Sequence, residues 1–386
     1  MFYGNAEFMD VPWETIVKIY RSRLATKRFN TLDEYVAHFL KFLEGETVLF
    51  SSEQQRRHLE VRLFGLLTAI QEDVNKRIED AFKSSKSVTP ELIQLTVRNV
   101  LKEYYRHFRA LKPLPQFDRA YGKKLVSDFA ELVAQNTQQI LQKLPRSRMD
   151  EARIQGIARA LITRDDFNGP VSGVVIAGFG EQEHFPKLRS FLVEGIICGV
   201  LKYRDDRRAD IYVQNTAQIS PFAQVDMVSE FMEGVHPTFA QFFQARLTTL
   251  FRGLPAEMLK CLGPFDPPRE SACRKSLEEF FAKLLNDLNE DQERIRRENH
   301  IDPVINTVAV LPKNELATMA EALINLTQFR QKITLQTETV GGPIDVAVIS
   351  KGDGFVWINR KHYFDPKYNP YFFSNYFREP LEGSRP

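Results

Sequence analysis

Apolar residues recur at helical spacing through the first part of the chain. A first helix is expected after Asp10 and Pro12, two residue types found at helix starts. Its apolar face consists of Trp13, Ile16, Val17, Tyr20 and Leu24. A Ser or Thr followed three residues later by Glu or Gln forms a capping box, which predicts helix starts at Thr31–Glu34 and Ser52–Gln55. Further helices are expected from Pro90 to about 110, near 119–144 and near 148–163.

The hydrophobic pattern changes at Gly169–Pro170. In "VSGVVIAGFG" an apolar run is closed by glycines, which is typical of a buried strand. The pattern predicts three antiparallel strands near 172–179, 191–203 and 209–216. After these strands the pattern predicts a helix from about Phe222 that is interrupted at Pro237, and then a charged helical region over 255–300. A helix from Pro312 and a hairpin over 344–360, with its turn in Lys351–Gly354, are expected last.

The order of these elements limits the fold class. Helices, then strands, then helices, then strands do not give the βαβα alternation of a doubly wound parallel sheet. The order instead favours an α+β protein in which helices are layered on mainly antiparallel sheets. The sequence contains no internal repeat and no low-complexity segment.

Composition and charge remove several classes of function. The 52 basic and 50 acidic residues leave a formal charge of +2, which gives no electrostatic basis for binding nucleic acid or an anionic membrane. The sequence has neither an apolar run of transmembrane length nor the pattern of a signal peptide. Cys198, Cys261 and Cys273 lack CxxC spacing, so we expect no disulfide framework, no metal site and no cofactor, and a reducing cytoplasm fits best.

Four short features have a structural and a chemical interpretation. Gly178–Gly180 follows a strand, but a third glycine is missing and two glutamates follow, so a strand-end turn is favoured over nucleotide binding. Asp165–Asp166 is interpreted as a solvated loop rather than an acid/base pair. His184 and His236 are isolated, which favours surface or packing roles over metal binding. The "RDDRR" segment, 204–208, is interpreted as the solvated end of a hairpin.

The C-terminal segment "HYFDPKYNPYFFSNYF" is rich in aromatic residues. Pro366 and Pro370 prevent one continuous helix here. Each aromatic side chain can bury about 150–250 Å². Two interpretations stay open: an extended strap over the chain's own helices, or a segment that docks onto a neighbouring subunit.

Three stretches together resemble a known family. They are "MFYGNAEFMDVPWETIVKIYR", "SGVVIAGFGEQEHFPKLRSFLVEG" and "LATMAEALINLTQFRQKITLQTETVGGPIDVAVISKGDGFVWI". They are similar to proteasome-type N-terminal-nucleophile (Ntn) hydrolases, in particular to bacterial proteins that resemble proteasome β-subunits and carry large helical insertions. The resemblance covers about 1–25, 171–250 and 303–362. It implies a four-layer αββα sandwich, ring-type homo-oligomers and a protein or peptide substrate.

The resemblance also implies a division of the chain. The segments are the start of the sandwich, with the end of a strand and two helices (1–50), a helical insertion (51–168), sandwich strands and helix (169–252), a second helical insertion (253–302), the last sandwich helix and hairpin (303–362), and the aromatic tail (363–386). In the family the opening "MFYGNA" stands near the end of the fourth strand. The sandwich is therefore expected to be incomplete at its N-terminal side, by roughly 30–50 residues at 5–6 residues per strand.

The family's catalytic residues have no counterpart in this sequence. In the family a Thr at the start of the first strand attacks an amide carbonyl while its own α-amine acts as the base, supported by an Asp and a Lys. No residue here matches these three, and the expected position of the nucleophile precedes Met1. Gly341 and Gly342 match the Gly-Gly step before the last hairpin, and Thr337 and Val340 occupy the positions of a supporting Asp and Ser. Thr337 can still donate a hydrogen bond, whereas Val340 cannot.

Two functional hypotheses follow from the sequence. The first is a proteasome-like hydrolase of peptide or other amide bonds, inactive in this chain because the nucleophile strand is absent. The second is a non-catalytic assembly or scaffold protein that uses the sandwich and the helical insertions to bind other proteins.

Overall fold

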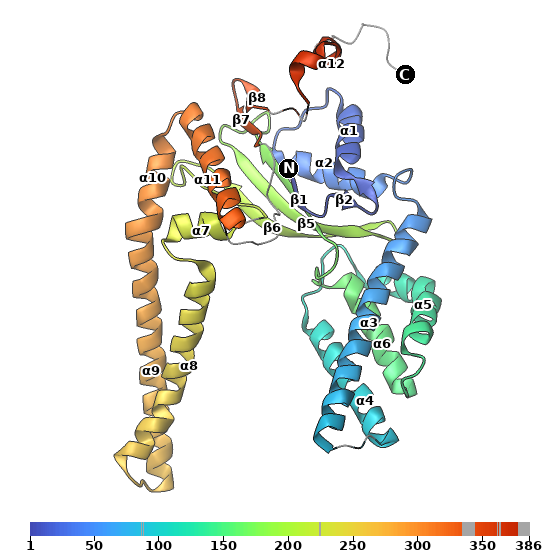
Figure 1. Cartoon of the computed structure of the whole chain (residues 1–386), viewed down its shortest axis with the longest axis vertical. Coiled ribbons are helices and arrows are strands. Elements are labelled where there is room, and N and C mark those ends of the chain that lie inside the picture. The colour runs from blue at the N-terminus through green and yellow to red at the C-terminus, as the bar shows by residue number, and fades with distance from the viewer. Residues whose placement is uncertain are drawn as a thin grey trace. The chain divides into compact units, whose positions relative to one another are not determined.

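The computed structural model describes most of the chain. The described residues are 1–85, 87, 89–223, 225–333, 344–360, 362 and 364–376. The chain divides into two compact units, unit 1 (Met1–Asp210) and unit 2 (Ile211–Pro386) (Figure 1). Both units combine helices and antiparallel strands, so the α+β class predicted from the sequence is confirmed. Among the described residues no helix is long and apolar enough to cross a membrane.

Unit 1 is built on a four-stranded sheet. Its strands lie in the order β1 (Phe2–Gly4), β4 (Ser172–Gly178), β5 (Lys187–Ile197) and β6 (Val200–Asp210), and every neighbouring pair is antiparallel. A separate small hairpin is formed by β2 (Glu7–Phe8) and β3 (Val11–Pro12). Phe2 is opposite Val174, and the amide of Val175 donates to the carbonyl of Met1 at 2.8 Å, so the chain's first residues are part of the sheet.

Two of the predicted strands have the wrong boundaries. The segment 191–203 contains a tight turn at Cys198–Gly199, and 209–216 leaves the sheet after Asp210. Both turn residues have positive φ, 48° and 76°, as in the two-residue turns that join antiparallel strands. Because the apolar run continues through this turn, hydrophobicity alone does not reveal it. The 204–208 segment, predicted to be the solvated end of a hairpin, lies inside β6 instead. Strand β6 is at the edge of the sheet, where charged side chains are tolerated.

Helices α1 (Trp13–Leu24) and α2 (Leu32–Gly45) pack on one face of this sheet. Their shared core joins helix, hairpin and strand side chains: Phe8, Trp13, Ile16, Phe39, Leu43, Phe50, Val174, Phe191 and Val193. The predicted cap at Thr31 is present, since its hydroxyl accepts from the Glu34 amide at 3.3 Å. The second capping box is one residue earlier than predicted, with Ser51 and Gln54 bonding each other's amides.

A four-helix bundle is inserted between α2 and β4. It consists of α3 (Ser52–Ser85), α4 (Pro90–Ala110), α5 (Arg119–Leu141) and α6 (Arg148–Thr163). The bundle has a core of its own, which includes Leu59, Leu63, Leu67, Ile70, Leu101 and Ile154. Ile197 at the end of β5 belongs to the same cluster, so the bundle is anchored to the sheet at the β5–β6 turn.

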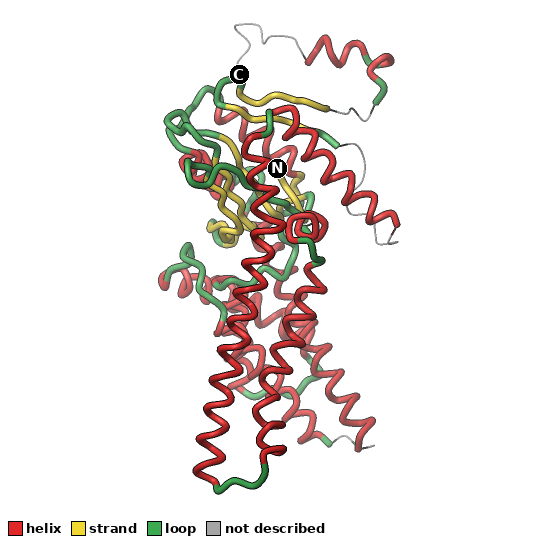
Figure 2. The backbone as a smooth tube through the Cα atoms, turned by 90° about the vertical axis from the view of Figure 1, so that its left-hand side faces the viewer, coloured by secondary structure: helices red, strands yellow, loops and turns green. Residues whose placement is uncertain are grey.

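Unit 2 is mainly helical. Its elements are α7 (Asp226–Glu233), α8 (Pro237–Leu262), α9 (Pro267–Arg296), a π-helical turn (Arg297–Ile301), α10 (Asp302–Val310), α11 (Lys313–Ile333), β7 (Val346–Ser350), β8 (Gly354–Asn359), a 3-10 turn (Pro366–Tyr368) and α12 (Pro370–Tyr376). The break at Pro237 and the closing hairpin were predicted correctly. Helices α8 and α9 lie side by side as a long antiparallel pair (Figure 2). In the described part of unit 2, β7 and β8 form a sheet of their own.

Candidate functional site

A fully buried lysine lies on β6 of unit 1. Lys202 is 0% exposed, and its Nζ donates to Glu194 Oε2 at 2.8 Å and to the carbonyls of Leu161 and Asp166, both at 2.7 Å. Three donated bonds require the ammonium form, because a neutral amine has only two protons. Burial lowers the pKa of Lys202, and the adjacent Glu194 carboxylate opposes that shift. The ammonium group is therefore matched to partners on a strand, a helix and a loop.

Arg62 of α3 completes this buried network. Its Nε donates to Glu194 Oε1 at 2.9 Å and one Nη donates to Asp166 Oδ2 at 3.1 Å. Glu194 thus bridges two cations, Lys202 and Arg62. The guanidinium group of Arg62 also lies against Gly169, where a Cβ would overlap it. The interpretation of Asp165–Asp166 as a solvated loop is wrong, because Asp166 is 3% exposed and Asp165 accepts from Arg204 at 2.8 Å. The cations that hold this loop come from distant parts of the chain.

His58 lies one helical turn before Arg62 on α3. Its ring packs against Gly195, where a Cβ would overlap it. The Nε2 atom is buried and has no hydrogen-bond partner in the part of the chain that the structure describes. Burial lowers the pKa of His58, an effect that the nearby Glu194 carboxylate opposes. The neutral imidazole is therefore favoured at this position, with Nε2 buried against Gly195.

A cavity of about 180 Å³ adjoins His58 and Glu194. The tip of the β2–β3 hairpin, the start of α3 and the start of β4 line it with polar side chains: Asn5, Glu7, Asp10, Gln54, Arg57 and Ser172. The Ser172 hydroxyl donates to the carbonyls of Asn5 and Glu7, at 3.0 and 3.3 Å. No hydrogen bond between Ser172 and His58 is present, so the two do not form an activated serine nucleophile.

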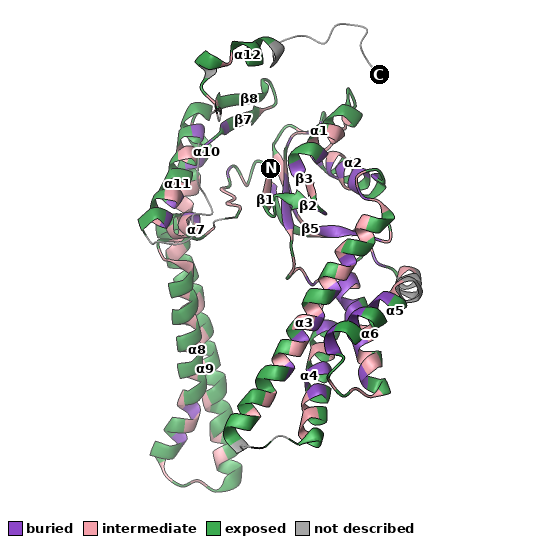
Figure 3. Cartoon of the chain, turned by 45° about the vertical axis from the view of Figure 1, so that its right-hand side comes forward, coloured by how far each residue is buried: buried purple, intermediate pink, exposed green. Residues whose placement is uncertain are grey.

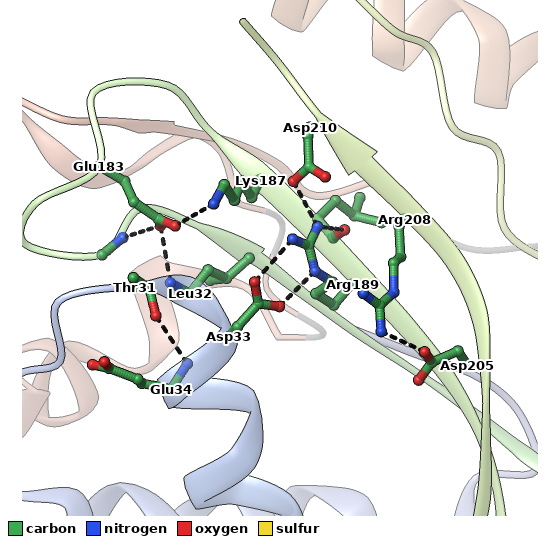
Figure 4. Close-up of polar contacts among 12 residues, drawn as sticks. Thr31, Leu32, Asp33, Glu34, Glu183, Lys187, Arg189, Asp205, Arg208 and Asp210 are labelled. Atoms are coloured by element: carbon green, nitrogen blue, oxygen red, sulfur yellow. Dashed lines mark hydrogen bonds and ion pairs between the residues drawn. The ribbon is translucent and has the colours of Figure 1, made fainter.

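A second polar cluster fastens the start of α2 to the sheet (Figure 4). Glu183 accepts from the amides of Leu32 at 2.9 Å and Gly180 at 2.8 Å, and from Lys187 at 2.6 Å. Burial alone would raise the pKa of Glu183, but the bonds from Lys187 and the two amides lower it. The Gly178–Gly180 segment is the strand-end turn predicted from the sequence, and a Cβ at Gly180 would overlap the Asn30 backbone.

Arg189 extends this cluster along β5. Its guanidinium donates to both carboxylate oxygens of Asp33, at 2.6 and 3.0 Å, and to Asp210 at 2.8 Å. The hydrogen bond from Arg189 lowers the pKa of Asp33. Asp205 and Arg208, also drawn in Figure 4, pair with each other within β6. The pairs Arg189–Asp33 and Arg189–Asp210 and the Glu183 contacts join different elements, which gives the cluster a role in holding α2 on the sheet.

The site residues implied by the family resemblance are not placed by this structure. Thr337, Val340, Gly341 and Gly342 lie outside the described residues.

Of the two isolated histidines, His184 is exposed, and His236 accepts from the amide of Thr238 at 3.2 Å as the N-cap of α8. The buried network and the cavity were not found from the sequence. The only available signal was the His58–Arg62 spacing of one helical turn, which is common in helices.

Unit 2 has a surface of a different kind. We define the helix-pair surface as the exposed large apolar side chains of α8 and α9: Phe239, Phe242, Phe243, Leu250, Met258, Leu262, Phe280, Leu284 and Ile295. Helix α9 has no buried residue. A groove of about 1080 Å³ opens at one end of the pair and is lined in part by Val235, Phe239, Phe243 and Ile295.

The aromatic tail also contributes exposed side chains. Tyr368 and Tyr371 are largely exposed, while Phe364 and Phe372 pack edge to face with their centroids 4.8 Å apart. Tyr363 and Phe377 lie outside the described residues. The choice between a strap and a docking segment therefore stays open.

Comparisons with known proteins give no family for this chain. No protein-family model matches it, and no curated protein or solved structure is significantly similar to it. The resemblance to Ntn hydrolases therefore stays a prediction based on sequence patterns.

Proposed function

We propose that this chain is an assembly protein whose unit 2 binds a second copy of the chain through the helix-pair surface. One observation carries the proposal: the 30 residues of α9 form a helix without a single buried residue. An isolated pair of helices is stabilised mainly by packing of its apolar faces. Large exposed apolar patches on a folded protein are typical of interaction surfaces.

Two further features support self-association. The formal charge of +2 on 386 residues gives little electrostatic repulsion between copies. The β7–β8 hairpin presents Phe355, Trp357 and Ile358 to solvent, and a two-stranded hairpin is only marginally stable alone. Closed homo-oligomers with two-fold symmetry are the commonest assemblies, so a second copy is the expected partner.

The test is the mass of the full chain in solution, measured by light scattering after size-exclusion chromatography. We expect a species larger than the monomer, and we expect the double variant F242D/F280D to be monomeric. The matched control is F64D, which places the same charge on an exposed Phe of α3 in unit 1. A monomeric wild-type chain, or a double variant that associates like the wild type, contradicts the proposal.

Amide-bond hydrolysis by an Ntn-type mechanism is the second candidate. It is favoured by the combination of an antiparallel sheet covered by α1 and α2, a glycine-closed strand β4 and a C-terminal hairpin, which are parts that the resemblance implies. Because no residue matches the family's nucleophile, we expect this chain to release no fluorophore from peptide amide substrates. Turnover that is lost in S172A would mean an internal serine nucleophile and would contradict the Ntn mechanism.

A further inference from the structure

The hairpin of unit 2 has an open edge along β8. Among the described residues β8 pairs with β7 alone, so the backbone groups on its other side have no strand partner. Residues 354–358 are exposed at every position, whereas β7 alternates between buried or half-buried and exposed residues. Exposure of consecutive residues means that both the outer edge of β8 and its side chains are uncovered in the described part of the chain.

The edge strand β6 of unit 1 shows how this chain protects an edge. Charged residues occupy positions 204–208 of β6, and its pairing with β5 contains two irregularities. Both features discourage pairing with a further strand. Strand β8, by contrast, reads GFVWIN, without a charge or a proline. Its pairing with β7 is regular from Gly354 to Trp357 and is irregular beyond, at Ile358. Strand β8 therefore keeps an edge that can accept another strand.

The order of residues in β8 fits a second copy of the same strand. When two identical antiparallel strands are related by a two-fold axis, one residue lies opposite its own copy. With Val356 in that position, Phe355 of each copy lies opposite Trp357 of the other. Cross-strand aromatic pairs of this kind stabilise a sheet. Both rings lie on one face of β8, with their centroids 4.9 Å apart, and both are exposed. Each side chain is therefore available to a second copy.

The charges beyond the ends of β8 favour an antiparallel arrangement. Asp353 precedes the strand and Arg360 follows it. Antiparallel pairing brings Asp353 of one copy close to Arg360 of the other, whereas parallel pairing would align like charges. Asp353 already accepts from Lys313 at 2.6 Å, so these end charges set the direction of pairing more than its strength.

We infer that β8 pairs with β8 of a second copy, antiparallel and centred on Val356, so that two hairpins form one four-stranded sheet. Backbone hydrogen bonds along the open edge and the two aromatic pairs hold the contact. The inference rests on the proposed assembly function, because so short a contact is weak unless the helix-pair surface already brings two copies together. It adds a defined strand register to that assembly.

A pair of charge variants tests the register. In this register F355K/W357K places Lys opposite Lys, and F355K/W357E places Lys opposite Glu. Both variants lose the same two aromatic side chains, so each is a control for the other. The measurement is sedimentation velocity over a dilution series at 0.15 M salt, where charges more than about 8 Å apart are screened. We expect F355K/W357K to have a dissociation constant for self-association at least tenfold higher than F355K/W357E. Equal dissociation constants overturn the inference.

Disulfide cross-linking tests the same contact with both aromatic side chains in place. V356C is expected to give a covalent dimer under mild oxidation, because residues that face each other across antiparallel strands have Cα atoms roughly 4.5–5.5 Å apart, within disulfide range. I349C is the matched control: Ile349 is 42% exposed and Val356 40%, but Ile349 lies on β7, one strand further from the axis. The wild-type chain, with its three free cysteines, gives the background.

The outcomes separate this inference from the assembly function. A chain that F242D/F280D makes monomeric, but whose V356C variant cross-links no better than I349C, keeps the assembly function and overturns the inference. A monomeric wild-type chain contradicts the assembly function. Cross-linking of V356C at millimolar protein then decides on the strand pairing alone: a dimer above the I349C level supports it, and its absence overturns it.

Discussion

The two units differ most in what holds their helices in place. In unit 1, α3 packs Leu59, Leu63, Leu67 and Ile70 into a core shared with three other helices. In the described part of unit 2, the buried apolar cluster consists of Ala317, Ile344 and Val346. Figure 3 shows the same contrast, with buried residues along α3–α6 and the sheet, and with exposed or intermediate residues along α9. Helix formation alone therefore does not indicate that a segment has a core.

The contrast also extends to charged residues. Unit 1 buries Lys202 and Glu194 as a hydrogen-bonded pair, whereas the Glu270–Arg274 pair of α9 lies at the surface. A buried charge is tolerated only where its partners are positioned by a rigid core. Unit 1 has such a core, and the described residues of unit 2 do not form one of comparable size.

The largest effect is expected from breaking the buried pair. Glu194→Ala leaves Lys202 and Arg62 without their shared carboxylate and should lower the free energy of unfolding by about 3–5 kcal/mol. Glu270→Ala removes a surface partner on α9 and should change it by less than about 1 kcal/mol. Urea denaturation followed by circular dichroism gives both values. Equal effects would mean that the two units do not differ in this respect.

A matched pair of apolar truncations sharpens the comparison. Leu59→Ala, in α3, creates a cavity in the bundle core and should lower the unfolding free energy by about 2–5 kcal/mol. Leu250→Ala, in α8, alters a side chain that is 55% exposed and should stay within about 0.5 kcal/mol. Both are measured in the F242D/F280D chain, so that self-association does not add to the result. A loss above 2 kcal/mol for Leu250→Ala would show that unit 2 has a core of its own.

The smallest effect is a pH dependence at His58. Burial holds the pKa of this imidazole below its ordinary value of 6.5, so the unfolded chain binds more protons just below that pH. Stability should therefore fall as the pH is lowered below 6.5, and His58→Gln should make the profile flatter there. The readout is the thermal midpoint at a series of pH values.

Element types could be predicted from the sequence more completely than their boundaries. The helices α1 to α6 and the β7–β8 hairpin follow from periodicity and capping residues, which act locally. The β5–β6 turn at Cys198–Gly199 did not follow, because the apolar run is unbroken across it. The burial of Asp166 was also missed, since Arg62 is 104 residues away in the sequence.

The candidate site shows the same limit more strongly. Glu7, Asp10 and Arg57 are ordinary surface residues in the sequence, and only the packing of the β2–β3 hairpin against α3 brings them to one cavity. The sequence instead directed attention to Thr337, Gly341 and Gly342 through family resemblance. These residues lie outside the described part of the chain, so that prediction stays a prediction.

The pairing of β1 with β4 has a consequence for folding during synthesis. The N-terminal ammonium group donates to the carbonyl of Val175, 174 positions later in the chain, at 3.0 Å. At 5–20 residues per second, β4 follows the first strand from the ribosome by roughly 10–35 s. The α3–α6 bundle, whose contacts are more local, can fold within that interval. Phe8, Trp13 and Ile16 meanwhile have no sheet to cover, so these apolar side chains stay uncovered until β4, β5 and β6 emerge.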